Sequence, residues 1–193
     1  MRPSDGYSHI FIDVNPGLGA LNQIAFTMSD RFIVPTNPDP FSLMALKTLL
    51  KVLPRWKIWA DNTRPLLQDA SYPLPMAEMK FVGEISQRFN RRNRKPTASY
   101  QVVITDIKNF VNDDFAKTLE KYGMTCPRDN YHLSEIPDFG AMLQKANELR
   151  IPIFCLKDNE LPGGASFDNT TAKRDEIRTT FSQLADILEE SFK

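Results

Sequence analysis

The chain has 193 residues, and its 24 basic and 24 acidic side chains give a formal net charge of zero. With 41% hydrophobic and 25% charged residues it can bury a core, which excludes a globally disordered chain. Zero net charge argues against a uniformly basic nucleic-acid binder but allows local patches. No apolar run approaches the roughly 18–20 residues that span a bilayer, and no signal-peptide pattern is present. We therefore expect a cytoplasmic protein without a membrane partner.

The first expected element is a strand at residues 9–14. The run His9-Ile-Phe-Ile-Asp-Val14 is typical of a strand buried on both faces of a parallel sheet. Such a strand would bring Asp13 to its carboxyl end, where open α/β sheets bind ligands. The next stretch, Gly17-Leu-Gly-Ala-Leu-Asn22, has the spacing of a dinucleotide-binding turn except that Asn22 replaces the third glycine. An NAD-type enzyme is therefore one alternative.

A second strand and a helix are expected between residues 31 and 53. Arg31-Phe-Ile-Val-Pro35 is a short apolar run bounded by turn residues. Asp39 followed by Pro40 is typical of a helix start, and the leucines that follow mark an apolar stripe expected to stop at Pro54. Residues 54–79 contain four prolines and are expected to form a long surface connection.

The middle of the chain combines a strand, a basic run and a helix. Residues 80–86 form the third expected strand, and apolar residues at helical spacing predict one long helix or two stacked helices within 100–122. Between them lie five cations and no anion, namely Arg88, Arg91, Arg92, Arg94 and Lys95. Such a run can bind the phosphates of DNA, and the alternative is a solvated loop.

Two helices and a strand are expected in the last third. Asp138 can cap a helix, Ile151-Pro-Ile-Phe-Cys-Leu156 is an apolar run of strand type, and residues 177–192 have the pattern of an amphipathic C-terminal helix. Alternating strands and helices predict a single α/β domain over residues 1–193, with a mostly parallel sheet flanked by helices.

The order of these motifs resembles the ParA/MinD family of partitioning ATPases, which have a P-loop NTPase fold. In that family a hydrophobic strand ending Asp-x-Pro-Pro precedes a helix, another strand and a Pro-rich turn. Here Asn15-Pro16 stands in place of the two prolines. The resemblance implies that Asp13 is a vestigial Walker B-like carboxylate that would hold magnesium. It also implies that Asn15, Pro16 and Gly17 shape a phosphate-side turn, whereas an ordinary strand end and turn is the alternative.

The resemblance continues downstream. Residues 81–89 are similar to the family strand that ends near the adenine, and Ile136-Pro137-Asp138 is similar to the turn that packs on the base. This similarity implies base contacts from Gln87, Pro137 and Asp138, although Pro137 could equally precede a helix. Because ParA-like proteins bind DNA nonspecifically through basic surface residues, the resemblance also favours DNA as a partner of residues 88–95.

A motif that such ATPases need is absent from this sequence. Their GxxxxGK loop cradles the phosphates, and no Gly-Lys dipeptide occurs here. Without that lysine, Asp13 alone would repel a triphosphate. The sequence therefore resembles the C-terminal part of such an ATPase. We expect no cofactor and no ATP hydrolysis for this chain alone, with ATP and magnesium bound by intact relatives.

The resemblance also implies an incomplete sheet. In the family the P-loop strand lies between the strand ending at Asp13 and the one at residues 32–34. Without it, those two strands should pair directly or leave edges that a second chain or another copy could fill. The expected function is that of a truncated ParA-like protein in plasmid or chromosome partitioning or positioning. The alternatives are a nucleotide-independent binding or scaffold module on the same fold and the dinucleotide enzyme.

Overall fold

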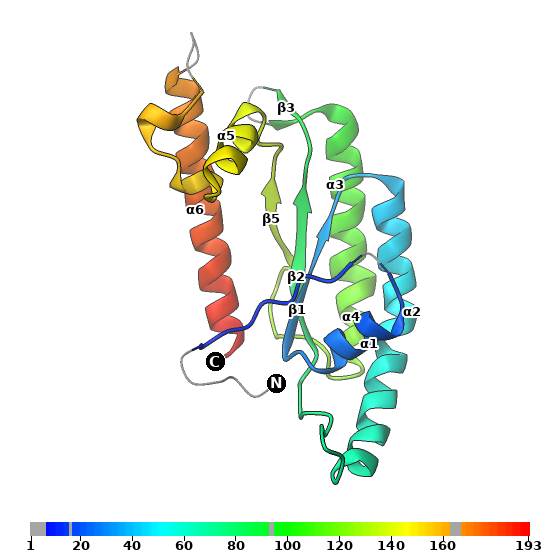
Figure 1. Ribbon diagram of the computed structural model, residues 1–193. Helices are drawn as coiled ribbons and strands as arrows, with labels where there is room; N and C mark the ends of the chain where they lie inside the picture. Colours follow the sequence, from blue (N-terminus) through cyan, green and yellow to red (C-terminus); the bar gives the residue numbers. More distant parts are fainter. Residues whose placement is uncertain (1–6, 16, 93–94, 163–166) are drawn as a thin grey trace.

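A three-stranded parallel sheet forms the centre of the protein (Figure 1). The computed structural model describes residues 7–15, 17–92, 95–162 and 167–193. The strands are β1 (Arg31–Thr36), β2 (Lys80–Gln87) and β5 (His132–Ile136), in the order β1-β2-β5. Helices lie on both sides of the sheet, so the predicted α/β fold with a parallel sheet flanked by helices is confirmed. None of the helices in the described ranges is long and apolar enough to cross a membrane.

One face of the sheet is covered by two long helical segments. The first is α2 (Pro40–Thr63), and the second runs from α3 (Ala98–Phe110) through a π-helical turn (Val111–Phe115) into α4 (Ala116–Glu120). Their apolar side chains pack on Phe81, which is fully buried at the centre of this layer. The Phe81 ring stacks on Tyr131 and contacts Phe32 and Phe115, with ring centroids 5.0–5.6 Å apart. This aromatic cluster is the main core of the molecule.

The opposite face is covered by a single helix, α6 (Phe167–Ser191). Leu184 of α6 packs on Ile85 and Ile136 of the sheet. The N-terminal half of α6 packs in a separate small core with α5 (Ala141–Leu149) and with a 3₁₀ turn at Ile153–Cys155. A second 3₁₀ turn follows at Asp158–Glu160. The expected C-terminal amphipathic helix is therefore present, and it is the element that closes this face.

A bulge beside Gly83, where Val82 has no partner on β1, decides which β2 side chains face which helix layer. The pairing register shifts between Phe32 and Ile33 on one side of β2 and between Glu84 and Ile85 within β2 on the other. A Cβ atom at Gly83 would lie 2.5 Å from the Leu133 side chain, so only glycine fits this close approach. Because the bulge interrupts the two-residue alternation, Phe81 and Glu84 both face the α3 layer.

The expected strand at residues 9–14 is wrong. These residues form no strand and pair with no strand of the described chain. Ile10, Phe11 and Ile12 are 59%, 79% and 56% exposed. Figure 1 shows the segment running across the direction of the strands toward α1 (Ala20–Thr27). An apolar run becomes a strand only where its backbone groups pair with another strand, and within the described chain this segment has no such pairing. Direct pairing of residues 9–14 with β1, one of the two outcomes expected for an incomplete sheet, does not occur.

The helix that begins at Asp39 continues past Pro54, contrary to the prediction. The start is as expected, because the Asp39 side chain accepts a hydrogen bond from the Ser42 N–H at 2.7 Å. The helix then tolerates Pro54 in its interior, since Leu53 and Trp56 on either side are buried in the main core. The connection expected over residues 54–79 is therefore helical to Thr63, and a 3₁₀ turn (Arg64–Leu67) follows.

Two further predictions in the second half are corrected. Residues 151–156 contain a 3₁₀ turn instead of a strand, because Ile153 and Leu156 pack into the small core around α5 and α6. The strand β5 was not predicted, since His132-Leu-Ser-Glu-Ile136 has only two apolar residues. The basic run is a short hairpin of β3 (Arg91–Arg92) and β4 (Lys95–Pro96) at the top of Figure 1.

Candidate functional site at the carboxyl end of the sheet

The carboxyl ends of β2 and β5 bring three predicted site residues together. Gln87 pairs in register with Ile136, and the Arg88 N–H donates to the Ile136 carbonyl at 2.9 Å. The Asp138 N–H then donates to the Phe89 carbonyl at 3.0 Å. Gln87, Pro137 and Asp138 therefore lie at one edge, which is where ligands of open α/β sheets bind.

Helix α6 lies against Pro137, the residue that the resemblance predicts to contact a base. Lys173 Nζ donates to the Asp138 carbonyl at 2.7 Å. Between Pro137 and α6 remains a cavity of about 10 Å³, lined also by Glu176 and Phe181. That volume holds about one water molecule. The Asp138 carboxylate accepts from the Gly140 N–H at 2.7 Å and thereby shapes the turn before α5. The three residues are adjacent, but this arrangement leaves no room for a base against Pro137.

The basic run lies beside this edge, and its cations differ in availability. Arg88 is exposed and has a φ of +58°. Arg91 forms an ion pair with Glu176 of α6, and its guanidinium lies 5.7 Å from the centre of the Phe89 ring. Arg94 and the side chains of Arg92 and Lys95 lie outside the described residues. Of the two side chains of this run that the structure describes, Arg88 is free and Arg91 is tied to α6.

The residues expected to form a phosphate and magnesium site are elsewhere. Asp13 lies in the exposed segment 7–15 and does not end a strand. The carbonyls of Asn15 and Gly17 both accept hydrogen bonds from the Asn22 side chain, at 2.6 and 2.7 Å, and Pro16 lies outside the described residues. This turn is held by Asn22 and is not built on the sheet edge. The dinucleotide alternative also loses the preceding strand that its fingerprint requires.

These residues do not fit ATP and magnesium. Within the described ranges, no group of three or more His, Cys, Asp or Glu side chains could hold a metal ion. The carboxyl end of the sheet presents Asp138, whose carboxylate already accepts from a backbone N–H. Lys173 at this edge donates to the Asp138 carbonyl, and the sequence has no GxxxxGK loop to form the amide cradle that a triphosphate needs.

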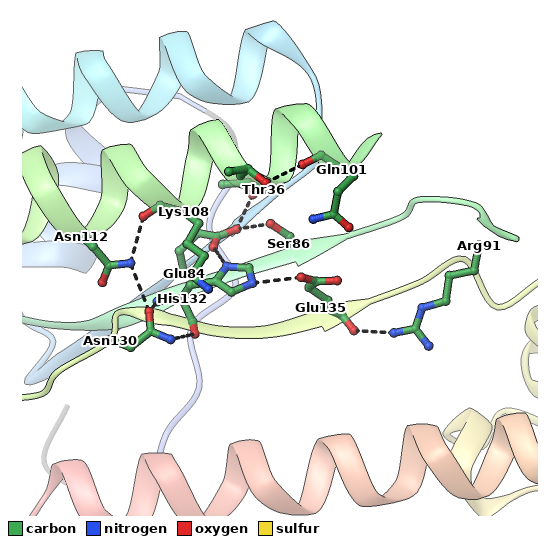
Figure 2. A network of polar contacts seen from close by, with 11 residues as sticks. Thr36, Glu84, Ser86, Arg91, Gln101, Lys108, Asn112, Asn130, His132 and Glu135 are labelled. Carbon is green, nitrogen blue, oxygen red and sulfur yellow. Dashed lines mark hydrogen bonds and ion pairs between the residues drawn. The ribbon is translucent and has the colours of Figure 1, made fainter. Parts of the chain in front are cut away.

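A polar network that sequence reasoning missed lies between the sheet and α3. Glu84 of β2 is fully buried, and its carboxylate accepts hydrogen bonds from the hydroxyls of Thr36 and Ser86. Nδ1 of His132 lies 2.7 Å from the other Glu84 oxygen, and Nε2 lies 3.6 Å from Glu135 (Figure 2). One carboxylate thus joins β1, β2 and β5.

The sequence held a weak signal for this network. Glu84 and Ser86 are two apart in the buried centre of β2, where the other residues are apolar or glycine, so they share a face. Their partner His132 could not be found because β5 itself was not predicted. Asn112 of the π-helical turn fixes the start of β5, since its side-chain oxygen Oδ1 accepts from the Tyr131 N–H at 2.8 Å. Within the described residues the His132 ring contacts two carboxylates, those of Glu84 and Glu135, so we assign the network a structural role.

Three groups with shifted pKa values, Glu78, Cys126 and Tyr131, lie at the opposite, amino end of the sheet. A hydrogen bond from Arg31 lowers the pKa of Glu78, and Lys80 adds to this effect. Burial raises the pKa of the Cys126 thiol and of the Tyr131 hydroxyl. Arg31 also donates from Nε to the Ser191 carbonyl at 2.7 Å and so attaches the end of α6. These shifts accompany structural contacts and do not mark a catalytic site.

Comparison with known proteins gives one family match. A family model described as an AAA domain matches residues 2–63, about a third of the chain. This region holds the N-terminal segment, α1, β1 and α2, and the family is of P-loop NTPase type and ParA/MinD-like. No curated protein and no solved structure matches the chain. The match to this P-loop NTPase-type family agrees with the parallel α/β sheet described above.

Proposed function

We propose that this chain is a ParA-like partitioning or positioning protein that contacts DNA through its basic hairpin and does not hydrolyse ATP by itself. Two observations support the family part. The AAA-domain match covers the stretch from the N-terminal segment to α2. The parallel sheet flanked by helices agrees with a P-loop NTPase-type family.

The observation that carries the DNA proposal is the placement of the basic run. Residues 88–95 hold five cations and no anion, and they leave the carboxyl end of β2 as a hairpin. In Figure 1 this hairpin stands at the end of the sheet opposite to the C-terminus. A concentrated run of cations binds DNA phosphates by releasing counterions, and this binding is independent of DNA sequence.

The position of Asp13 supports the second part of the proposal. This side chain would have to reach a magnesium ion at the sheet edge, yet it lies in an exposed segment outside the sheet. The sequence also has no Gly-Lys dipeptide to neutralise phosphates. We therefore expect calorimetric titration of ATP with magnesium to give no heat of binding. Tight binding by the isolated chain would contradict this part of the proposal.

DNA binding is best tested by fluorescence anisotropy with a duplex of arbitrary sequence at increasing salt. The test variant is Arg88→Asn with Arg92→Gln, because asparagine tolerates the positive φ of residue 88. Each lost phosphate contact makes the negative slope of log K against log salt shallower by about 1, so we expect the slope of this variant to be shallower by about 2. The matched control is Lys51→Gln with Arg55→Gln, two exposed cations of α2, which should leave the slope unchanged.

The exposed apolar residues 10–12 favour a second function, that of a binding or scaffold module without nucleotide. The same titration separates the two. An absence of DNA binding at low salt, with the fold intact by circular dichroism, would leave the scaffold function and remove the first proposal.

A further inference from the structure

The end of α2 and the loop after it carry a group of exposed apolar side chains. Figure 1 shows this part of the chain extending beyond the amino end of the sheet, away from the basic hairpin. Leu66 of the 3₁₀ turn is 82% exposed, and Tyr72 and Met76 of the loop are 93% and 86% exposed. The last turns of α2 add Ile58 and Trp59, which are also exposed. We call these five residues the apolar tip, and exposed apolar clusters of this kind mark contact sites.

The backbone that carries the apolar tip is fixed by contacts in the middle of the chain. The guanidinium of Arg64 is buried at the base of the loop, where Nε donates to the Pro75 carbonyl at 2.9 Å and Nη2 donates to the Thr27 carbonyl at 3.0 Å. Its Nη1 donates to the Asp61 carboxylate at 2.6 Å. One side chain thus joins α1, α2 and the end of the loop. Because the backbone is already ordered, a contact made by the tip costs little conformational entropy.

The chemistry of the exposed residues changes in a regular order from the tip toward the body of the molecule. Residues 65–77 contain one charged residue, Asp69. Two exposed cations, Arg55 and Lys51, share a face of α2 with Trp59, because the three positions are four residues apart. They lie about 6 and 12 Å behind Trp59 along the helix axis, at 1.5 Å per residue. From the end inward the order is therefore apolar, then aromatic, then cationic.

We propose that the apolar tip inserts into the surface of a membrane that contains anionic lipid. The order of the residues matches the layers of such a surface: the end residues reach the acyl chains, Trp59 lies at the interface, and the cations face the headgroup charge. Lipid fits this convex tip better than a protein does, because lipid adapts to side chains that project separately, whereas a protein interface needs a complementary shape.

The proposed contact differs from a membrane span. The expectation of no membrane partner rested on the lack of a spanning segment, and a surface contact needs none. The inference goes beyond the proposed function and does not depend on it, because the basic hairpin stands at the other end of the sheet in Figure 1.

The first test is cosedimentation with vesicles of phosphatidylcholine, with and without phosphatidylserine. We expect the chain to bind the mixed vesicles more tightly than those of phosphatidylcholine alone. Leu66→Gln with Met76→Gln should weaken binding to the mixed vesicles by more than about tenfold, because two inserted apolar side chains are lost. The matched control is Met44→Gln with Val102→Gln, two exposed apolar residues of α2 and α3, which should bind like wild type. Circular dichroism checks that both variants are folded.

The second test separates the charge of the lipid from its apolar interior. A cation near an anionic surface is worth about fivefold in affinity. Lys51→Gln with Arg55→Gln should therefore weaken binding to the mixed vesicles by at least about fivefold and leave binding to phosphatidylcholine unchanged. Wild type that binds neither kind of vesicle, or binds both equally, would overturn the proposal. Equal binding by the Leu66→Gln, Met76→Gln variant and its control would also overturn it and would leave the apolar tip to a protein partner.

Discussion

Residues 9–14 and strand β2 have similar sequences but opposite environments. Both are short apolar runs with one acidic residue, Asp13 in the first and Glu84 in the second. β2 has a strand on each side, and its six central residues are buried. The N-terminal segment has no strand on either side within the described chain, and it is exposed. The comparison shows that strand composition predicts burial only where neighbours satisfy the backbone.

The largest expected effect separates the two regions directly. Phe81→Ala removes the ring at the centre of the aromatic cluster, so we expect a loss of about 3–5 kcal/mol in the free energy of unfolding. Phe11→Ala removes an exposed ring of the same size and should change it by less than about 0.5 kcal/mol. Urea unfolding at a concentration where the protein is monomeric measures both. Similar losses for the two variants would break the comparison.

The next effect concerns Glu84, the buried acidic residue of β2. The Glu84 carboxylate accepts from two hydroxyls and also contacts His132. A glutamine amide cannot accept from all three groups, so we expect Glu84→Gln to lower the free energy of unfolding by about 1–3 kcal/mol. The matched control is Glu135→Gln, which stands on the other side of the His132 ring and is partly exposed. It should cost less than about 1 kcal/mol. An equal loss for both would show that Glu84 does not join the three strands.

The ion pair between Arg91 and α6 gives a smaller effect with a defined sign. Glu176→Gln removes the partner of Arg91 and frees its guanidinium for phosphate. DNA affinity should therefore rise, and the salt slope should steepen by about 1. The control Glu148→Gln loses a comparable ion pair with Lys145 on α5 and should not change either quantity. Unchanged binding for Glu176→Gln, with wild-type binding present, would show that Arg91 does not contact DNA.

The smallest effect is a pH dependence at the amino end of the sheet. Arg31 lowers the pKa of Glu78 in the folded state, so this carboxylate adds stability above its unfolded pKa. That contribution is lost as the pH falls through the lower, folded pKa. Because the Glu78 side chain is half exposed, we expect Glu78→Gln to cost less than about 1 kcal/mol at neutral pH. The difference in the free energy of unfolding between wild type and Glu78→Gln, measured by urea unfolding, should vanish in acid. A difference that persists there would show that the Glu78 carboxylate is not its source.

Local signals predicted those parts of the fold that depend on neighbours in sequence. The Asp39–Pro40 helix start, β1, β2 and the C-terminal helix follow from capping chemistry and hydrophobic period. The continuation of α2 through Pro54 depends on burial of Leu53 and Trp56, which no local pattern reports. The exposure of residues 9–14 likewise depends on which strands are present.

The candidate site shows the same division. The resemblance brought attention to Gln87, Pro137 and Asp138, and the structure places them at one edge. It could not show that α6 lies against Pro137, because Lys173 is 36 positions away in sequence. The Glu84 network also joins strands far apart in sequence, and its partner strand β5 is too polar to be found by hydrophobic pattern.

Hydrogen exchange at residues 10–14 tests the central contrast most directly. At a concentration where the chain is monomeric, these amides should exchange at the rate of an unstructured peptide while those of β2 stay protected. Protection of residues 10–14 in the monomer would contradict the account, because it would show that the segment already has a strand partner within its own chain.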